Sequence, residues 1–334
     1  MSLVIHAPNI HQGGGRTLLL PLLAAVKQPC TALVDARLAP LTTLSPELKL
    51  VPVQPTLSGR LRAEWQLHRL CQPGDKVLCF GNLPPLLPNA GTVYVYLQNR
   101  YLAQRRALAG LPLQARLRLL VERIWLRSRL GHARLLVQTE SMEAEVRHSM
   151  QRHSIVLPFA PTLALPQASG EKQHDFIYVA SGEPHKNHRR LVEAWAVLAS
   201  RGLRPSLCLT LHPLRDAALL AWVQEQASRH GLDIDNQRAE HDAIARLYAS
   251  GKALIYPSLF ESFGLPLLEA SAAGLPIVAA ERDYVRNVVD PVASFDPESA
   301  LSIARAVMRQ LGYASPPPAP PDASTFLQQL EALD

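Results

Sequence analysis

Short apolar segments alternate with longer amphipathic segments along most of the sequence, and this alternation constrains the fold more than any other feature. Strands that alternate with helices favour an open, mostly parallel sheet with helices on both faces. In the first half we expect strands at residues 3–7, 31–35, 49–53, 77–80, 93–97 and 135–138, and helices at 16–27, 61–71, 115–130 and 141–149. The first half therefore predicts one doubly wound α/β domain.

A second alternating series follows residues 160–174, which carry Pro161, Pro166 and Gly170 without clear periodicity and are typical of a linker. Its expected strands are 176–180, 207–211, 253–256 and 276–279, and its expected helices are 188–200, 216–230, 242–249, 266–273 and 300–311. The proline-rich residues 315–321 cannot be helical, and a final amphipathic helix is expected at 323–333. We therefore predict two facing Rossmann-like domains, 1–165 and 172–314, and a tail, 315–334, that crosses back onto the first domain.

The composition supports two buried cores and excludes a disordered or fibrous chain, because 48% of the 334 residues are hydrophobic and 19% are charged.

The four cysteines have no CxxC spacing and the twelve histidines have no paired-ligand spacing, so we expect no disulfide framework, metal or cofactor. The start of the sequence lacks the features of a signal peptide, and the apolar stretch 18–26 is too short to span a bilayer. A cytoplasmic location is the expectation.

Basic residues are concentrated in one segment. The formal net charge is +6, and residues 100–134, from Arg100 to Arg134, carry nine arginines against the single acid Glu122. Within the expected helix, arginines occupy one face and another face is formed by Leu113, Leu117, Leu120 and Ile124, with Trp125 between them. Such a helix can lie on an anionic membrane surface, here the inner face of the cytoplasmic membrane, and a solvated helix face explains the pattern equally well. Nucleic acid is not an expected partner, because no helix-turn-helix signal or aromatic platform is present.

Ligands of open parallel sheets bind outside the carboxyl ends of the strands, so the loops that run from strand to helix are the most informative. The first of these loops, residues 8–16, contains Gly13, Gly14 and Gly15, whose backbone N–H groups could approach an anion or a sugar hydroxyl. A plain flexible turn is the alternative interpretation.

The second loop, residues 181–187, ends at Asn187, a good N-cap residue, and Arg189 and Arg190 follow in the first helical turn. Positive charge at the positive end of the helix dipole is unfavourable unless a phosphate binds there, with Lys186 as its ion-pair donor. Arginines that point to solvent are the alternative.

The third loop follows the expected strand 253–256. Glu261 and Gly264 lie in the loop, Pro266 is placed to begin a helix, and Glu269 lies about one turn into that helix. Both carboxylates can reach the same crevice, where acceptor-only groups suit the hydroxyls of a sugar.

The segment from Tyr248 to Glu298 resembles the retaining glycosyltransferases of family 4, which have the GT-B fold. The resemblance rests on the runs Ala253-Leu-Ile-Tyr-Pro-Ser, Glu261-Ser-Phe-Gly-Leu-Pro-Leu-Leu-Glu269-Ala and Gly274-Leu-Pro-Ile-Val-Ala279. The family's two glutamates, separated by seven residues, match Glu261 and Glu269. The likeness extends to residues 182–187 and, more faintly, to the glycine loop.

This resemblance implies a retaining, metal-independent enzyme that moves a hexose, mannose-like or similar, from a nucleotide diphosphate sugar to a saccharide acceptor. The acceptor would be lipid-linked, in the synthesis of lipopolysaccharide or another surface polysaccharide. Glu261 and Lys186 would be catalytic, and the donor would contact Glu269, Ser262, Phe263, Gly264, Leu265, Ser181, Gly182, Gly14 and Gly15. The acceptor side would be formed by His11, Gln98, Asn99 and Arg100.

The sequence departs from the family pattern in two places. Residues 181–183 lack the arginine that the family usually uses as a second diphosphate partner, so Arg189, Arg190 or Arg16 would have to replace it. Gln98 follows the strand after which the family often has a histidine. These departures keep a non-catalytic nucleotide-sugar-binding subunit as an alternative, and an epimerase or phosphorylase of the same fold is another.

Asp233-Ile234-Asp235 is a DxD triplet, a pattern that holds a metal ion in glycosyltransferases of the other main fold. No nucleotide-binding strand is expected directly before it, so the triplet favours a solvated loop.

Overall fold

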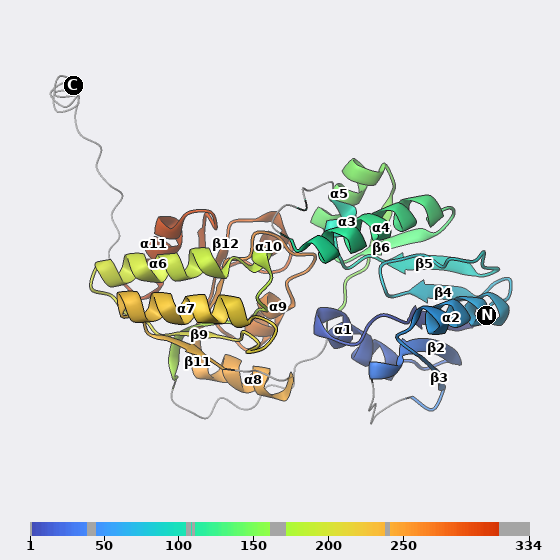
Figure 1. Ribbon diagram of the computed structural model, residues 1–334, viewed down its shortest axis with the longest axis horizontal. Helices are drawn as coiled ribbons and strands as arrows, with labels where there is room; N and C mark the ends of the chain where they lie inside the picture. Colours follow the sequence, from blue (N-terminus) through green and yellow to red (C-terminus); the bar gives the residue numbers. More distant parts are fainter. Residues whose placement is uncertain are drawn as a thin grey trace, which may run out of the picture.

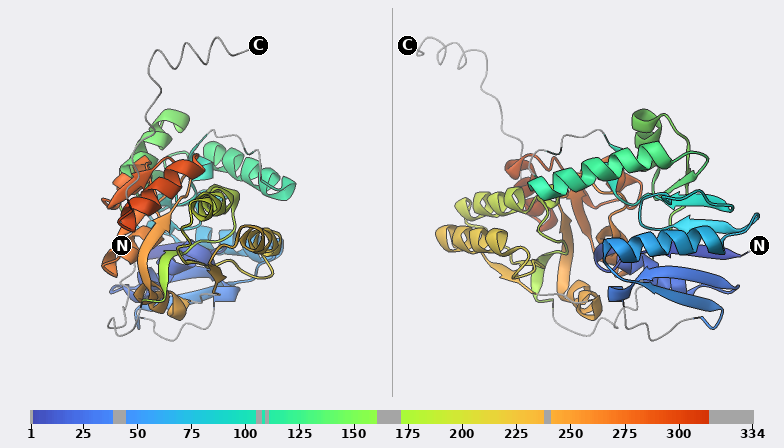
Figure 2. Two further views of the ribbon diagram at one scale, coloured as in Figure 1. Left: turned by 90° about the vertical axis from the view of Figure 1, so that its left-hand side faces the viewer. Right: turned by 45° about the vertical axis from the view of Figure 1, so that its right-hand side comes forward.

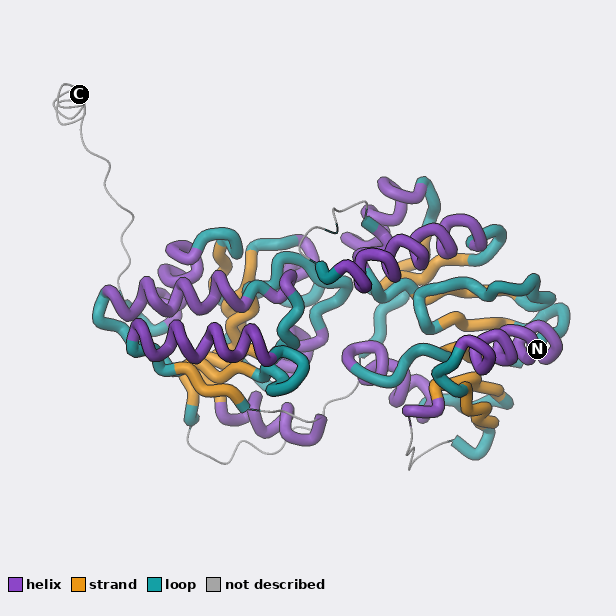
Figure 3. Tube along the Cα trace, in the orientation of Figure 1, coloured by secondary structure: helices purple, strands orange, loops and turns teal. Residues whose placement is uncertain are grey.

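The computed structural model describes residues 2–38, 45–104, 108, 111–160, 172–237 and 241–313, which form two domains, each built on a parallel sheet (Figure 1). Helices cover both faces of each sheet (Figure 3). The predicted fold class, two Rossmann-like α/β domains, is confirmed. Most of the expected linker and the whole tail, 315–334, lie outside the described residues.

The N-terminal sheet has the strand order β3-β2-β1-β4-β5-β6-β7, with every neighbouring pair parallel. Its strands are β1 (Leu3–Ala7), β2 (Cys30–Asp35), β3 (Leu48–Val53), β4 (Lys76–Cys79), β5 (Thr92–Tyr96), β6 (Arg134–Val137) and β7 (Ser154–Val156). Its helices are α1 (Gly13–Ala24), η1 (Ala36–Leu38), α2 (Leu57–Leu70), α3 (Arg100–Ala103), α4 (Leu113–Arg129) and α5 (Glu140–Met150).

The C-terminal sheet has the order β10-β9-β8-β11-β12-β13, again with parallel pairs only. Its strands are β8 (His174–Tyr178), β9 (Leu207–Leu209), β10 (Ile234–Asn236), β11 (Gly251–Tyr256), β12 (Ile277–Ala280) and β13 (Ala293–Phe295). Its helices are η2 (Pro184–Lys186), α6 (His188–Ser200), α7 (Ala217–His230), α8 (His241–Ser250), α9 (Leu265–Ala272), α10 (Asp283–Arg286) and α11 (Ala300–Gln310).

Apolar side chains on both faces of the sheets form the cores. In the N-terminal domain, Leu19 and Leu23 of α1 pack on one face of the sheet. Buried residues of α2 and α4, among them Leu67 and Leu126, pack together on the other face. Strands buried on both faces read as continuous apolar runs, as Leu254-Ile255-Tyr256 in β11 does.

Three local expectations are wrong. The glycines expected in a loop form the first turn of α1, which begins at Gly13, not at residue 16. Asp233-Ile234-Asp235 is expected as a loop, but Ile234–Asn236 form β10, which pairs with β9 at the edge of the sheet. Ile234 packs on the core, whereas Asp233 and Asp235 are exposed. Asn187 does not cap α6 with its side chain, which donates instead to the carbonyls of Pro257 at 3.1 Å and Pro297 at 2.7 Å.

The carboxyl ends of strands from both sheets meet between the domains. Residues that follow β1, β5, β8, β9 and β11 line one cavity there. Figure 1 shows α1 at the boundary between the two domains, and Figure 2 shows the molecule from two further sides. This junction is the position where open parallel sheets bind ligands.

Candidate functional site

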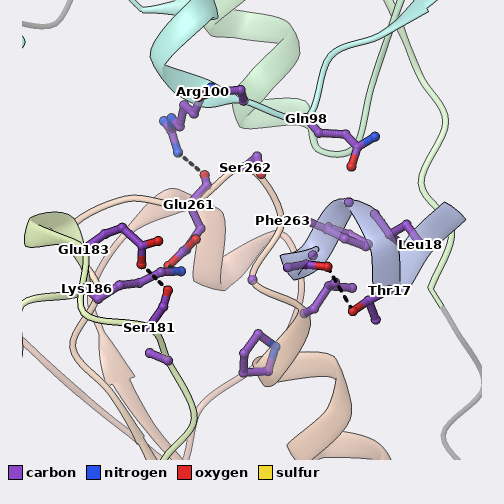
Figure 4. A pocket seen from close by; sticks show the side chains of 18 of the residues that line it. Thr17, Leu18, Gln98, Arg100, Ser181, Glu183, Lys186, Glu261, Ser262 and Phe263 are labelled. Atoms are coloured by element: carbon purple, nitrogen blue, oxygen red, sulfur yellow. Dashed lines mark hydrogen bonds and ion pairs between the residues drawn. The ribbon is translucent and has the colours of Figure 1, made fainter. Parts of the chain in front are cut away.

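A cavity of about 670 Å³ lies between the domains, a volume typical of small-molecule sites. Its N-terminal side is formed by the first turn of α1 and the loop after β5, and its C-terminal side by the loops after β8, β9 and β11. Figure 4 shows the side chains from both domains pointing into it. The lining includes most residues that the sequence singled out: Gly14, Gly15, Gln98, Asn99, Arg100, Ser181, Lys186, Glu261, Ser262, Phe263, Gly264, Leu265 and Glu269.

An ion pair forms the centre of the C-terminal side. Lys186 at the end of η2 places its Nζ 2.6 Å from Oε1 of Glu261 in the loop after β11. The same oxygen accepts hydrogen bonds from the hydroxyls of Ser258 at 2.6 Å and Tyr256 at 3.1 Å. Burial alone would raise the pKa of Glu261, but attraction to Lys186 and His185 and these hydrogen bonds hold that pKa below its ordinary value. The carboxylate is therefore ionised and fixed in position at neutral pH.

Glu269 lies deeper, one turn into α9, and is buried. The hydroxyl of Tyr248 donates to its Oε2 at 2.8 Å. Helix α9 begins after Gly264, whose φ of +80° requires glycine, and Pro266 occupies the first turn as expected. The helix N-terminus and Glu269 thus line the same wall of the cavity.

Two side-chain hydrogen bonds and the ring of Tyr101, which packs against His185 and Phe260, join the N-terminal domain to this wall. Nη1 of Arg100 donates to the backbone oxygen of Glu261 at 2.9 Å, as Figure 4 shows, and the hydroxyl of Thr139 donates to the backbone oxygen of Ser262 at 3.2 Å. The loop that carries Glu261 is therefore held by side chains of both domains.

Gln98 and Asn99 line the N-terminal side and are held by the fold. Both backbone N–H groups donate to Oδ1 of Asn82, at 2.6 and 2.9 Å, and Nε2 of Gln98 donates to the carbonyl of Phe80 at 3.0 Å. The side chain of Asn99 accepts from the N–H of Tyr101 at the start of α3. Of these two side chains, Gln98 presents an amide oxygen toward the glycine turn, 3.9 Å from where a Cβ on Gly15 would lie.

Two residues expected at the site lie elsewhere. His11 does not line the cavity, and its Nδ1 is 3.8 Å from Oδ2 of Asp35. Gly182 also lies outside the lining because it packs against Asp216, whose Cγ would be 2.7 Å from a Cβ at position 182. Asp216 links the loops after β8 and β9, since it also accepts from the backbone N–H of His212 at 2.9 Å.

Arg215, which no sequence pattern singled out, lines the cavity from the loop after β9. Its guanidinium is 3.3 Å from Asp216, and this hydrogen bond raises the arginine pKa further. Neither arginine of α6 lines the cavity, because Arg189 stacks over Trp222 and Arg190 pairs with Glu193 at 2.6 Å. Arg16 is also outside the lining. The available signal was that Arg215 lies in a loop between the expected strand 207–211 and the expected helix 216–230.

Among the described residues, one group has the composition of a metal site: His174, Cys208 and Asp235, with ligand atoms within 4.8 Å of one another. None of the three lines the cavity. No described helix is long and apolar enough to cross a membrane.

Comparisons with known proteins agree with this geometry. Residues 164–311, less than half of the chain, match the family described as Glycosyl transferases group 1. The O-antigen chain mannosyltransferase B of Escherichia coli is 29% identical over 137 residues, which cover 40% of this chain and 36% of that protein. The serotype-specific mannosyltransferase WbdA of Escherichia coli is 30% identical over 148 residues, 40% of this chain and 16% of that protein. The similarity thus spans about a third or less of these relatives.

Two solved structures share the fold over nearly the whole length. HepE of Anabaena, in complex with UDP and glucose, gives a TM-score of 0.68 at 12% identity, covering 93% of this chain and 90% of that chain. WaaG, a glycosyltransferase involved in lipopolysaccharide biosynthesis, gives 0.67 at 17% identity with the same coverage. The chain therefore has the GT-B fold and carries, in its C-terminal domain, a group 1 glycosyltransferase domain.

Proposed function

We propose that this protein transfers a hexosyl group, mannose or a similar sugar, from a nucleotide diphosphate sugar to a hydroxyl of a saccharide. The observation that carries the proposal is the partly buried Lys186–Glu261 pair in the inter-domain cavity. A lysine and an ionised carboxylate held together supply a cation for a leaving diphosphate and an anion for the sugar that it leaves. The named activities of the O-antigen relatives support mannose as the sugar.

The donor is assigned to the C-terminal side. Glu269 would accept hydrogen bonds from the two ribose hydroxyls, because one of its oxygens is oriented by Tyr248 and its burial strengthens such bonds. Lys186, Arg215 and the N-terminus of α9 would bind the diphosphate without a metal ion. Ser181, Ser262, Phe263 and Leu265 complete this side, and Gly14 and Gly15 would close over the sugar from α1.

The acceptor is assigned to the side lined by Gln98, Asn99 and Arg100, and we propose that it is lipid-linked. Its hydroxyl would attack the anomeric carbon from the face that the diphosphate leaves, so that configuration is retained. The bond from the anomeric carbon to the phosphate oxygen breaks, the new bond to the acceptor oxygen forms, and a leaving phosphate oxygen takes the acceptor proton. Lys186 stabilises the charge that develops on that oxygen.

Binding of the donor is tested by the melting temperature with UDP, GDP, UDP-glucose and GDP-mannose in the presence of EDTA. A ligand at 100 times its Kd stabilises the folded state by about 2.7 kcal/mol. One nucleotide class should raise the melting temperature of the wild type and of Glu193→Gln, an exposed control, and should fail with Glu269→Gln. The absence of a shift with every nucleotide would overturn the assignment.

Transfer is tested separately, with the stabilising donor and a saccharide acceptor, by NMR of the anomeric proton of the product. A product with the configuration of the donor supports retention. Binding without turnover would instead indicate a non-catalytic nucleotide-sugar-binding subunit, and turnover that requires free phosphate would indicate a phosphorylase.

A further inference from the structure

Helix α4 turns an apolar face outward, away from the sheet that it covers. Leu119 and Leu126 are its buried residues, whereas Leu113, Leu117, Leu120, Val121 and Ile124 are all exposed, Leu113 to 71% and Ile124 to 68%. At about 100° per residue, the five exposed side chains fall within an arc of about 100°, roughly opposite the buried ones. The sequence predicted two faces on this helix and left a membrane surface and a solvated helix face as equally good interpretations.

Arginines lie on both sides of the apolar arc. Arg116 and Arg127 fall on one side of it by helical position, and Arg118 and Arg129 on the other. Arginines that flank exposed aliphatic residues are typical of a helix in a membrane interface, because their long side chains reach the headgroups while the apolar residues enter the acyl region. Trp125 is not part of this face, since its indole N–H donates to the carbonyl of Pro84 at 3.0 Å.

Helix α2 carries a second face of the same kind, which was not expected from the sequence. Leu57, Leu61 and Trp65 are exposed, to 82%, 61% and 48%, and share an arc of about 80°. Arg69 lies over the Trp65 ring at 3.7 Å, and Arg62 is exposed beside it. A tryptophan with a neighbouring arginine is a typical interfacial anchor.

The two helices cover the same face of the N-terminal sheet. Ala63 and Leu67 of α2 belong to one core cluster with Leu119 and Leu126 of α4, and both helices run along one side of the domain in Figure 2. Burial raises the pKa of Glu122 on α4, and attraction to Arg118 and to Arg60 of α2 opposes this, so α2 and α4 lie close together here. We name the surface formed by α2 and α4 the two-helix face.

We propose that the two-helix face docks on an anionic lipid bilayer. The exposed arcs of the two adjacent helices hold eight large apolar side chains, and an exposed apolar surface of this kind is typical of an interaction site. The excess of arginine around them fits anionic headgroups and disfavours a second copy of the same face, which would bring like charges together. This inference does not depend on the proposed sugar transfer.

The test is flotation of the full chain with vesicles of phosphatidylcholine alone and with phosphatidylglycerol added. We expect binding to the anionic vesicles only, weakened by high salt. Leu117→Ser with Ile124→Ser, or Leu61→Ser with Trp65→Ser, should lower the partition coefficient at least about tenfold. Arg62→Gln and Arg129→Gln should each lower it roughly fivefold.

The matched control is Val292→Ser with Leu301→Ser, which removes exposed apolar side chains of the C-terminal domain and should leave binding unchanged. All variants replace exposed residues, and unfolding curves check that each is folded. Equal binding to neutral vesicles, or equal loss in the control, would overturn the proposal. So would a dimer in light scattering that dissociates in the α4 variant while no vesicle binds, because a second copy would then cover this face.

Discussion

The two sides of the cavity differ in the chemical groups that line them. The C-terminal side consists of charged groups that already have partners: Lys186 with Glu261, Glu269 with Tyr248, and Arg215 with Asp216. The N-terminal side consists mainly of glycine backbone and amide side chains, and Arg100 is the arginine among the described lining residues of that domain. On the proposed function, charge stabilisation belongs to one domain and the shape of the sugar and acceptor sites to the other.

Lys186→Ala is the substitution from which we expect the largest loss of activity on the charged side of the cavity. It removes the proposed cation and leaves Glu261 buried without its ion-pair partner. We expect kcat to fall roughly 100- to 1,000-fold, more than KM rises, because the lysine would act mainly on charge in the transition state. Steady-state kinetics with Lys186→Arg as the charge-conserving control measure this. A change of only a few-fold would show that the charged side is not the source of catalysis.

The second prediction concerns pH and a histidine beneath the charged side. His188 is buried against Tyr178, and burial, then repulsion by Lys186, lowers its pKa to about 3. The unfolded chain binds the proton near the ordinary value of 6.5, so stability is fully present above pH 6.5 and is lost as pH falls toward 3. At pH 4, this loss amounts to about 3 kcal/mol. Urea unfolding of His188→Phe should show a flatter dependence between pH 7 and 4.

His6 supplies the matched comparison in the N-terminal domain. Burial lowers its pKa to about 4, but Glu64, 3.5 Å away, has a pKa that burial raises and so titrates in the opposite sense. The pKa of His6 is shifted less than that of His188, so His6→Phe should flatten the pH dependence less than His188→Phe, and the opposite titration of Glu64 stays in place. The reverse order would contradict the assignment of the more acid-sensitive site to the charged domain.

Arg215→Ala tests whether the charged side of the cavity binds the diphosphate. We expect about tenfold weaker binding of the nucleoside diphosphate, the loss typical of one charge-assisted hydrogen bond. The affinity for the nucleoside without phosphates should not change. Isothermal titration with Arg190→Ala as the control tests this, because Arg190 pairs with Glu193 outside the cavity. Equal losses for both arginines would contradict a specific role for Arg215.

The smallest effect, a change in the free energy of unfolding, is expected at the glycine turn of the N-terminal side. A Cβ at Gly14 would meet only Leu265 at 3.7 Å, so Gly14→Ala should change the free energy of unfolding by less than about 0.5 kcal/mol. Gly182→Ala would place its Cβ against Asp216 and should cost about 1–3 kcal/mol. Thermal unfolding of both variants measures the difference. A large loss from Gly14→Ala would show that the glycine turn is as tightly built as the charged side.

Sequence alone could predict most of the strands and helices in their order, though not β10, β13, α3 and α10, and it could predict the positions of Lys186, Glu261 and Glu269. These positions depend on local patterns: an apolar strand, a loop with glycine or proline, and a helix. Arg215 could not be ranked in this way, because it reaches the cavity only through the order of β9 beside β8. His11 follows the right strand, yet its side chain lies beside Asp35.

Sequence alone also could not predict which side of an amphipathic helix faces solvent. Periodicity shows that α4 has an apolar side, but the buried contacts come from Leu119 and Leu126, which are fewer than the exposed leucines. Only the packing on the sheet decides which side faces outward. The edge strand β10 was missed for a related reason, since a strand with one open edge carries polar residues that read as a loop.

Glu261 is bound through two different parts of the same residue. Its carboxylate belongs to the ion pair with Lys186, while Arg100 of the other domain binds its peptide oxygen. A peptide oxygen is present whatever the side chain, so a substitution at position 261 can abolish the chemistry and keep the bond that joins the domains. Reactivity and the closeness of the two domains can therefore be varied independently, by mutation in the laboratory or by drift in evolution.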